Sequence, residues 1–345
     1  MKLFNRSNAL VKNKLCITGF CLVVNLLTLS SSTYAQQLDR VSVQLDWMPA
    51  GDKAFFTLGV AKGFYKKQGI DATFRSGRGS SDAIMQAAIG NADLATAGLS
   101  TLMIAKSEND IPVKAVMSFY SKLPDAIFTT EESGITGVDT ANGKIVAMPT
   151  FSSSTVLWPA LLKQNHVSVS AIKTLKVDPS SLIPLLAQDN VQMTLSWVVK
   201  APEFKHALNG SNRTLKIITF SDLGIDSYGW SLIASEKMIN ERSDVLKRFI
   251  VATKESIFYA NQHPLEAAKA LKESTPEIDE AISAEIYKAS IPLLENDISK
   301  RDGLGAFNPK LLSLTWYWVA TSMDYKADAL DPESVVDRRF MVNDK

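Results

Sequence analysis

Residues 41–75 read VSVQLDWMPAGDKAFFTLGVAKGFYKKQGIDATFR. The alternation in VSVQL predicts a strand at residues 41–45, the apolar spacing predicts a helix at 55–67, and residues 71–75 alternate again. A strand, a helix and a second strand in this order are typical of parallel strands joined by a helical crossover. The first strand stops at Asp46 and Trp47, an acid and an indole able to hold a polar, flat molecule.

The same alternation continues along the chain in two series. In the first series, strands are predicted at residues 94–97 and 113–118 and helices at 80–89 and 100–109. In the second, strands are predicted at 125–129, 144–148, 174–177, 193–196 and 215–219, and helices at 153–165, 182–187 and 202–208. After a strand at 228–234, the pattern becomes helical at 244–261, 264–273, 278–294 and 309–323. This order predicts an α/β protein with parallel sheets.

The helical tail contains no third sheet, so its helices must bury their apolar faces on a lobe that already exists. Two consecutive domains would also satisfy the order of elements, but we favour one lobe interrupted by the other, with crossings near residues 122–125 and 227–231. We therefore predict that residues 36–124 and 229–345 form lobe 1 and that residues 125–228 form lobe 2. Two crossing strands would join the lobes.

The first 35 residues are typical of an export signal. Residues 15–29 are apolar, and residues 33–35 form a small-x-small cleavage site. An apolar core of this length is shorter than the roughly 20 residues of a membrane-spanning helix. The positive charges ahead of it are Lys2, Arg6, Lys12 and Lys14. We expect cleavage after Ala35 and a periplasmic protein made of the remaining 310 residues.

Composition argues against several functional classes. Both cysteines, Cys16 and Cys21, lie in the leader, so we expect no disulfide, thiolate metal site or cysteine nucleophile in the exported chain. That chain keeps 33 basic and 36 acidic residues, a net charge of −3 without a basic cluster, so we expect no nucleic-acid partner. His166, His206 and His263 are dispersed, and metal-binding, phosphate-binding and hydrolase motifs are missing. We expect no metal, no cofactor and no enzyme activity.

Ligands of open α/β sheets bind beyond the carboxyl ends of strands, beside helix amino termini. At such positions this sequence places hydroxyl groups, and the run SSST at residues 152–155 supplies four in succession. One serine suffices to cap a helix, so the run favours contact with a ligand. Aromatic residues at strand ends either contact a ligand or pack in the core. The predicted ligand-binding residues are Asp46, Trp47, Ser80, Ser81, Thr96, Ser152, Ser153, Trp197 and Tyr228.

Five long stretches carry a likeness to a known family. They read LDWMPAGDKAFFTLGVAKGFYKKQGID, GRGSSDAIMQAAIGNADLATAG, IPVKAVMSFY, SGITGVDTANGKIVAMPTFSSS and ASEKMINERSDVLKRFIVATKESIFYANQHPLEAA. Together they resemble the NMT1/THI5-like, or SsuA/THI5-like, periplasmic substrate-binding proteins of ABC transporters. The resemblance implies a type II periplasmic-binding-protein fold, in which two α/β lobes enclose a small-molecule solute and present it to ABC permease subunits. We also expect the protein to be a monomer. Within the predicted site, the resemblance assigns ligand contact to Asp46, Trp47, Ser80, Ser81, Thr96, Ser153 and Trp197.

Departures from the family pattern bear on the ligand. Pyrimidine receptors of this group often continue DWxPN with a nearby histidine, whereas this chain has Ala50 and Lys53 there, and Gln192 stands where many relatives have an acid. These departures indicate a ligand different from the pyrimidine precursors themselves. We expect a small polar or heteroaromatic solute that resembles a thiamine-pyrimidine precursor.

Three alternatives remain open. An organic anion such as a sulfonate, taurine or nitrate would depend on Arg78 or Lys53. A pyrimidine-synthesis enzyme of the THI5 type would require the cysteine-rich motif that the exported chain lacks. A sensor would dock on a signalling receptor instead of a permease.

Overall fold

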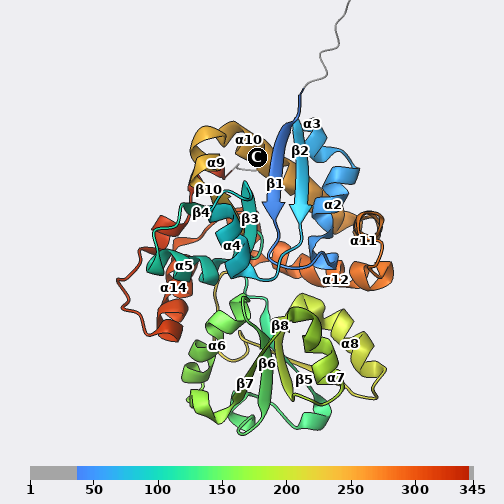
Figure 1. The fold of residues 1–345 in the computed structure, drawn as a ribbon, viewed down its shortest axis with the longest axis vertical. Helices are drawn as coiled ribbons and strands as arrows, with labels where there is room; N and C mark the ends of the chain where they lie inside the picture. Colours follow the sequence, from blue (N-terminus) through green and yellow to red (C-terminus); the bar gives the residue numbers. More distant parts are fainter. Residues whose placement is uncertain (1–36, 342–345) are drawn as a thin grey trace, which may run out of the picture. The chain divides into compact units, whose positions relative to one another are not determined.

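The computed structural model describes residues 37–341, which form two five-stranded sheets (Figure 1). The first sheet has the order β2-β1-β3-β10-β4 and the second β7-β6-β8-β5-β9. Strands of the first are β1 (Asp39–Gln44), β2 (Ile70–Arg75), β3 (Leu94–Gly98), β4 (Val113–Ser118) and β10 (Trp230–Ser235). Strands of the second are β5 (Asp125–Thr130), β6 (Ile145–Pro149), β7 (Lys173–Val177), β8 (Met193–Trp197) and β9 (Leu215–Thr219). We refer to the first sheet with its helices as lobe 1 and to the second as lobe 2.

The chain passes between the lobes twice, from β4 to β5 and from β9 to β10. This distribution of strands agrees with the predicted interruption of one lobe by the other, although the boundaries at residues 124–125 and 228–229 stay a prediction. The predicted leader, residues 1–35, lies outside the described residues. Within residues 37–341, no helix combines the length and the apolar character needed to cross a bilayer.

Both sheets are mixed, which corrects the prediction of purely parallel sheets. In lobe 1, β1 runs parallel to β2 and β3, whereas β10 runs antiparallel to β3 and β4. In lobe 2, β6 runs parallel to β7 and β8, whereas β5 runs antiparallel to β8 and β9. The register explains the reversal: Trp230 opens β10 opposite Gly98 at the end of β3, and Asp125 opens β5 opposite Trp197 at the end of β8. A strand that arrives from the other lobe starts where its neighbours end, and therefore runs against them.

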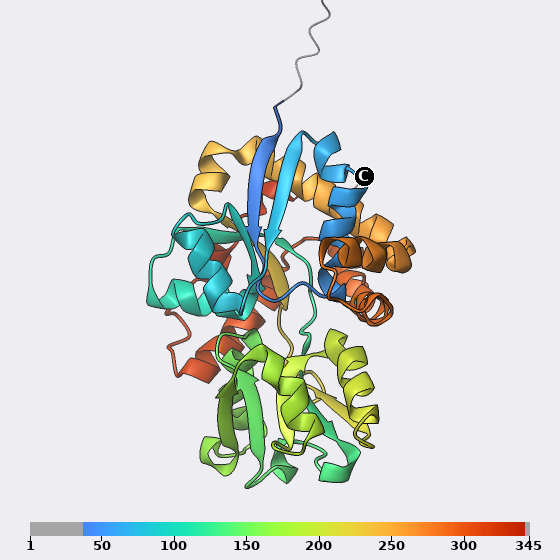
Figure 2. The same cartoon turned by 45° about the vertical axis from the view of Figure 1, so that its right-hand side comes forward.

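Helices flank both sheets (Figures 1 and 2). In lobe 1 they are α2 (Ala54–Ala61), α3 (Phe64–Lys67), α4 (Ser80–Ala88), α5 (Leu99–Glu108), α9 (Glu236–Glu241), α10 (Ser243–Gln262), α11 (Pro264–Ser274), α12 (Glu280–Leu294), α13 (Asp297–Asp302) and α14 (Pro309–Met323). In lobe 2 they are α6 (Ser153–Gln164), α7 (Leu182–Ala187) and α8 (Ala201–Asn209). The single helix predicted at residues 55–67 is two helices, because Gly63 adopts φ 75°, a left-handed conformation that ends the first.

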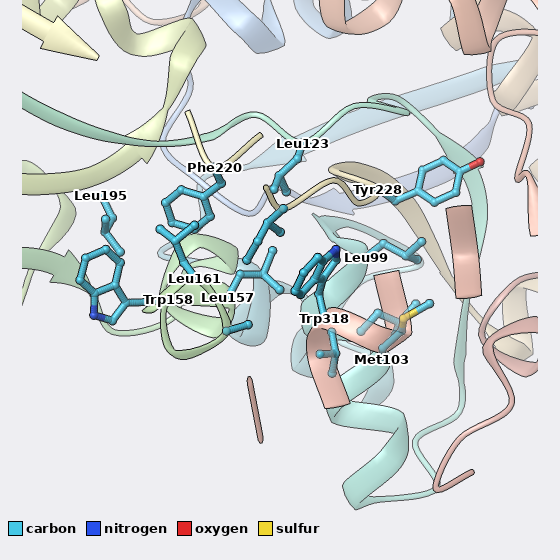
Figure 3. Close-up of a cluster of buried hydrophobic side chains, with 14 of the residues drawn as sticks. Leu99, Met103, Leu123, Leu157, Trp158, Leu161, Leu195, Phe220, Tyr228 and Trp318 are labelled. Carbon is cyan, nitrogen blue, oxygen red and sulfur yellow. The ribbon is translucent and has the colours of Figure 1, made fainter. Parts of the chain in front are cut away.

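A hydrophobic cluster contains buried residues from both lobes (Figure 3). It combines Leu99 and Met103 of α5, Trp158 of α6 and Trp318 of α14, all of them buried. Helix α14 packs against both α5 of lobe 1 and α6 of lobe 2. The lobes are therefore held together by buried apolar surface as well as by the two chain crossings, and burial of this kind contributes about 25 cal/mol per Å².

Candidate functional site

A cavity lies between the two lobes at the carboxyl ends of their strands. Lobe 1 contributes Asp46, Trp47, Asp52, Lys53 and Ser80 to its lining. Lobe 2 contributes Pro149, Ser152, Ser153, Ser154, Leu195, Ser196, Trp197 and Lys200. The empty space among these residues is about 450 Å³ including the part open to solvent, but the centres of water-sized molecules reach only about 40 Å³ of it. A solute the size of an aromatic ring therefore requires the lobes to separate or the lining side chains to rearrange.

Lys53 is the centre of a buried charge cluster. Its Nζ is 2.7 Å from Asp52 Oδ2 and 3.6 Å from Asp46 Oδ1, and the three side chains are at most 3% exposed. Burial alone would lower the pKa of Lys53, but the two carboxylates outweigh it and hold that pKa above its ordinary value. Burial would raise the pKa of Asp52, yet Lys53 and then Lys200 bring it below its ordinary value. At Asp46 burial dominates and the pKa is raised, although Lys53 and Thr96 oppose the shift.

Two indole rings and a hydroxyl hold this cluster in place. Lys53 Nζ is 4.8 Å from the ring centroid of Trp230 and 5.4 Å from that of Trp197, within the range of cation–π attraction. Thr96 Oγ1 donates to Asp46 Oδ1 at 2.9 Å and accepts the backbone N–H of Asp46 at 3.0 Å. Because Trp197 belongs to lobe 2, the ammonium group of Lys53 contacts both lobes.

Lobe 2 presents the amino terminus of α6, where one serine caps the helix and two others bind a buried carboxylate. Ser152 Oγ caps the helix by accepting a backbone N–H three residues further on, at 3.3 Å. Ser153 Oγ donates to Asp125 Oδ1 at 3.2 Å, and Ser154 Oγ donates to the same oxygen. Trp197 Nε1 in turn donates to Ser153 Oγ at 3.2 Å. These hydroxyls therefore orient a carboxylate and an indole at the cavity wall.

Most of the predicted ligand-binding residues come together at this cavity. The residues that line it are Asp46, Trp47, Ser80, Ser152, Ser153 and Trp197. Thr96 is buried and supports Asp46 from behind without lining the cavity. Ser81 is exposed outside the cavity. Their contact with a ligand stays a prediction.

Tyr228 requires a correction, because it packs inside lobe 1 instead of facing the cavity. Its side chain is fully buried against Phe307, and it lies in the hydrophobic cluster of Figure 3. Its hydroxyl donates to Ala306 O at 3.2 Å and accepts the backbone N–H of Asn308 at 2.5 Å. A buried tyrosine whose hydroxyl is satisfied by backbone groups has a packing role.

Charged residues of the site were missing from the sequence-based set. Asp52 and Lys200 line the cavity, and Asp125 lies directly behind its serines. Lys53 appeared only as a departure from the family pattern and as a possible anion ligand. The available signal was that Asp52 and Lys53, an acid and a base, stand next to each other immediately before the apolar helix AFFTLGVA, since charged side chains are rarely buried unless they are paired.

Titratable residues elsewhere do not gather into a metal centre: among residues 37–341, no group of three or more His, Cys, Asp or Glu side chains is arranged to hold a metal ion.

Comparison with protein families finds one model that covers more than half of the chain. The model described as NMT1/THI5 like matches residues 51–267. Among curated proteins, the riboflavin-binding protein RibY of Chloroflexus aurantiacus is 22% identical over 286 residues, which cover 81% of this chain and 79% of that protein.

Comparison with solved structures finds the same two-lobed α/β architecture. The alkanesulfonate-binding protein SsuA from Xanthomonas axonopodis pv. citri, bound to MOPS, superposes with a TM-score of 0.68 at 13% identity, covering 87% of this chain and 98% of that one. The periplasmic nitrate-binding protein NrtA from Synechocystis PCC 6803 gives 0.65 at 12% identity, with coverage of 88% and 87%. At this level of identity the likeness establishes the fold, which is that of periplasmic binding proteins.

Proposed function

The chain belongs to the NMT1/THI5-like family, and from this premise we propose that it is the periplasmic solute-binding component of an ABC importer, capturing a small polar or heteroaromatic solute between its lobes. The observation that carries the proposal is the shared cavity: an acid and an indole from lobe 1 face hydroxyls and a second indole from lobe 2. Stacking on Trp47 and Trp197 would supply contact area, while Asp46 and the serines would orient the solute. We propose that the protein acts as a monomer and delivers its solute to ABC permease subunits.

The charges of the site favour a ring with N–H donors over an organic anion. Lys53 is already paired with two buried carboxylates, and Lys200 is 3.3 Å from Glu203. Arg78 is outside the cavity lining, with its side chain 76% exposed beside Asp82. The hydroxyls of Ser153 and Ser154 already donate to the buried carboxyl of Asp125. An incoming anion would meet the carboxylates of Asp46 and Asp52 on the wall formed by lobe 1 and no unpaired cation among the described lining residues, which disfavours it.

The proteins similar to this chain bind different classes of ligand. One curated relative is a riboflavin-binding protein, which fits a heteroaromatic solute, whereas two structural neighbours bind an alkanesulfonate and nitrate. At 13% and 12% identity, the two structural neighbours share only the fold with this chain. The charges around the cavity are therefore better evidence for the ligand class than the ligands of these neighbours. A pyrimidine-synthesis activity is the competing proposal from another class.

The test begins with mass spectrometry of any solute released from protein purified without refolding. A thermal-shift panel follows, with an aminopyrimidine precursor of thiamine, riboflavin, taurine, an alkanesulfonate and nitrate. A ligand at 100 times its Kd stabilises the folded protein by about 2.7 kcal/mol. We expect an aromatic compound to raise the melting temperature and the anions to leave it unchanged. Stabilisation by an anion alone would overturn the proposed ligand class, and pyrimidine product formed by the protein with pyridoxal phosphate and iron would favour the enzyme.

Trp47 provides a variant to accompany the panel. Because Trp47 is only half-buried, replacing it with alanine should leave the fold intact while removing a stacking surface. Stacking contributes roughly 0.5–1.5 kcal/mol beyond burial, so titration calorimetry should show the affinity for the identified solute falling about 2- to 12-fold. Tyr317→Ala, at an exposed position on α14, is the matched control. Equal affinity of Trp47→Ala and the control would remove Trp47 from the site.

A further inference from the structure

Asp125 and Trp197 face each other at the start of β5 and the end of β8, where their backbones are paired in register. Their side chains are joined by a chain of hydrogen bonds. Trp197 Nε1 donates to Ser153 Oγ at 3.2 Å, and Ser153 Oγ donates to Asp125 Oδ1 at 3.2 Å. The hydroxyl of Ser153 thus accepts a hydrogen bond from the indole and donates one to the carboxylate.

The carboxyl of Asp125 is held asymmetrically. Its Oδ1 accepts from both Ser153 and Ser154, whereas its Oδ2 is buried and has no hydrogen-bond partner among residues 37–341. The residue is 1% exposed. A buried carboxylate oxygen without a donor is costly unless the group serves a purpose or takes up a proton.

We propose that Asp125 is a positioning residue of the cavity: its carboxylate fixes the hydroxyl of Ser153, and through that hydroxyl it sets the orientation and hydrogen bonding of the Trp197 indole. Asp125 does not line the cavity, so it acts on a bound molecule through Trp197, which does. A hydroxyl that donates to a carboxylate becomes a stronger acceptor, because hydrogen bonds in a chain polarise one another. The indole N–H is therefore held more tightly while Asp125 is ionised.

Protonation of Asp125 would weaken this hold within an accessible pH range. Burial raises the pKa of Asp125 to about 6, although the hydrogen bonds from Ser154 and then Ser153 oppose the shift. As pH falls through that value, the carboxylate loses its charge and Ser153 loses its charged acceptor. A resulting change in the affinity for a solute stacked on Trp197 rests on the proposed function. The change in the hydrogen bond of the Trp197 indole does not depend on that function.

Other titratable groups near Trp197 must be separated from Asp125. Lys53 lies over the Trp197 ring from lobe 1, paired with Asp46 and Asp52, and Lys200 lines the same cavity from lobe 2. Asp46 is the relevant competitor, because burial raises its pKa as well. Asp46 is linked to Trp197 through Lys53, whereas Asp125 is linked to it through Ser153. Variants of Asp125 and Ser153 therefore distinguish the two routes.

The experiment follows indole N–H signals by NMR in the exported protein with ¹⁵N-labelled tryptophan, without added ligand, between pH 4.5 and 8. Trp197→Phe identifies the Trp197 signal. In the wild type we expect the chemical shift of this signal to change with a midpoint near pH 6, because burial raises the pKa of Asp125 to about 6. It should stay still in Asp125→Asn and in Ser153→Ala. In the matched control Ser154→Ala it should still move, but with a midpoint at higher pH, because this variant loses a hydrogen bond that lowers the pKa of Asp125. The remaining indole signals report whether each variant is folded.

A Trp197 signal that does not titrate in the wild type, or that titrates equally in Asp125→Asn and Ser153→Ala, overturns the proposal. If Asp125→Asn does not fold, Ser153→Ala and Ser154→Ala decide the matter, since only the first interrupts the route to Trp197. The two proposals fail separately. Should no solute of the panel bind, the proposed function fails while the indole titration stands; should a solute bind while the indole does not titrate, only the positioning role of Asp125 fails.

Discussion

Replacing Lys53 with methionine is expected to destabilise the protein by about 3–5 kcal/mol, the usual cost of removing one partner from a buried ion pair. Asp46 and Asp52 would remain within the protein, each at most 3% exposed, without the ammonium group that lies 3.6 and 2.7 Å from them. Denaturant unfolding followed by circular dichroism measures the loss. The matched control is Lys62→Met, because Lys62 also pairs with a carboxylate, Glu266, and contacts an aromatic ring, but at an exposed position. The control should show little change.

The pH dependence of the Lys53→Met deficit provides a second check. In the wild type, Lys53 holds the pKa of Asp52 low, so this carboxylate contributes stability above its unfolded pKa that is lost as pH falls through its folded pKa. Without Lys53, burial raises the pKa of both Asp52 and Asp46, so the folded variant binds more protons than the unfolded one. Its stability therefore rises as pH falls, and the deficit should be smaller at pH 5 than at pH 8. A deficit independent of pH would assign the loss to packing.

Neutralising the carboxylates along with the lysine should restore much of the stability. The triple variant Asp46→Asn, Asp52→Asn, Lys53→Met contains no buried charge at this place, and replacement of a complete buried ion pair is often neutral. Comparing the single and triple variants isolates the coupling among the three groups. A triple variant less stable than Lys53→Met would mean that the charges are not the source of the deficit.

Much of the fold was predictable because its elements are encoded locally. The bounds predicted for the strand at residues 113–118 and the helix at 309–323 coincide with β4 and α14. The break at Gly63 was missed, since a left-handed glycine inside an apolar run leaves the helical spacing unchanged on either side. Strand direction was also missed, because β5 and β10 have the same local pattern as their parallel neighbours. Their reversal follows from where the chain enters each lobe.

Part of the cavity lining was predictable, where the signal was position along a strand or helix. Asp46 at a strand end and Ser153 at a helix start were found in this way, and both lie where expected relative to the sheets. Tyr228 was misplaced because a residue near a chain crossing has a core on one side and the cavity on the other. Asp125 was missed because an acid that opens a strand resembles a turn residue. Its role depends on partners 28 and 29 residues later in the chain.

Closure of the lobes provides the other large expected effect, through Gly98. This residue ends β3 in lobe 1, and a Cβ built on it would lie 2.6 Å from Ser153 Cβ in lobe 2. Its φ of −64° and ψ of 133° suit any residue, so alanine introduces no backbone strain. The only cost of Gly98→Ala is overpacking where the lobes meet, about 1–3 kcal/mol. A form with separated lobes avoids that cost.

If the side chains rearrange around the solute and the lobes stay as close as in this structure, with Ser153 beside Gly98, then Gly98→Ala should weaken solute binding about 5- to 150-fold while changing the unfolding free energy much less. Titration calorimetry with the co-purified solute measures the affinity, and small-angle X-ray scattering should show a larger radius of gyration for the variant. Gly210→Ala is the matched control, since Gly210 has helical dihedrals and the nearest atom to its Cβ would be 3.4 Å away. Wild-type affinity in Gly98→Ala, with an unchanged scattering curve, would show that the lobes do not need this contact to hold a solute. A loss of stability as large as the loss of affinity would instead mean that the contact persists throughout the folded state, so that the lobes do not separate there.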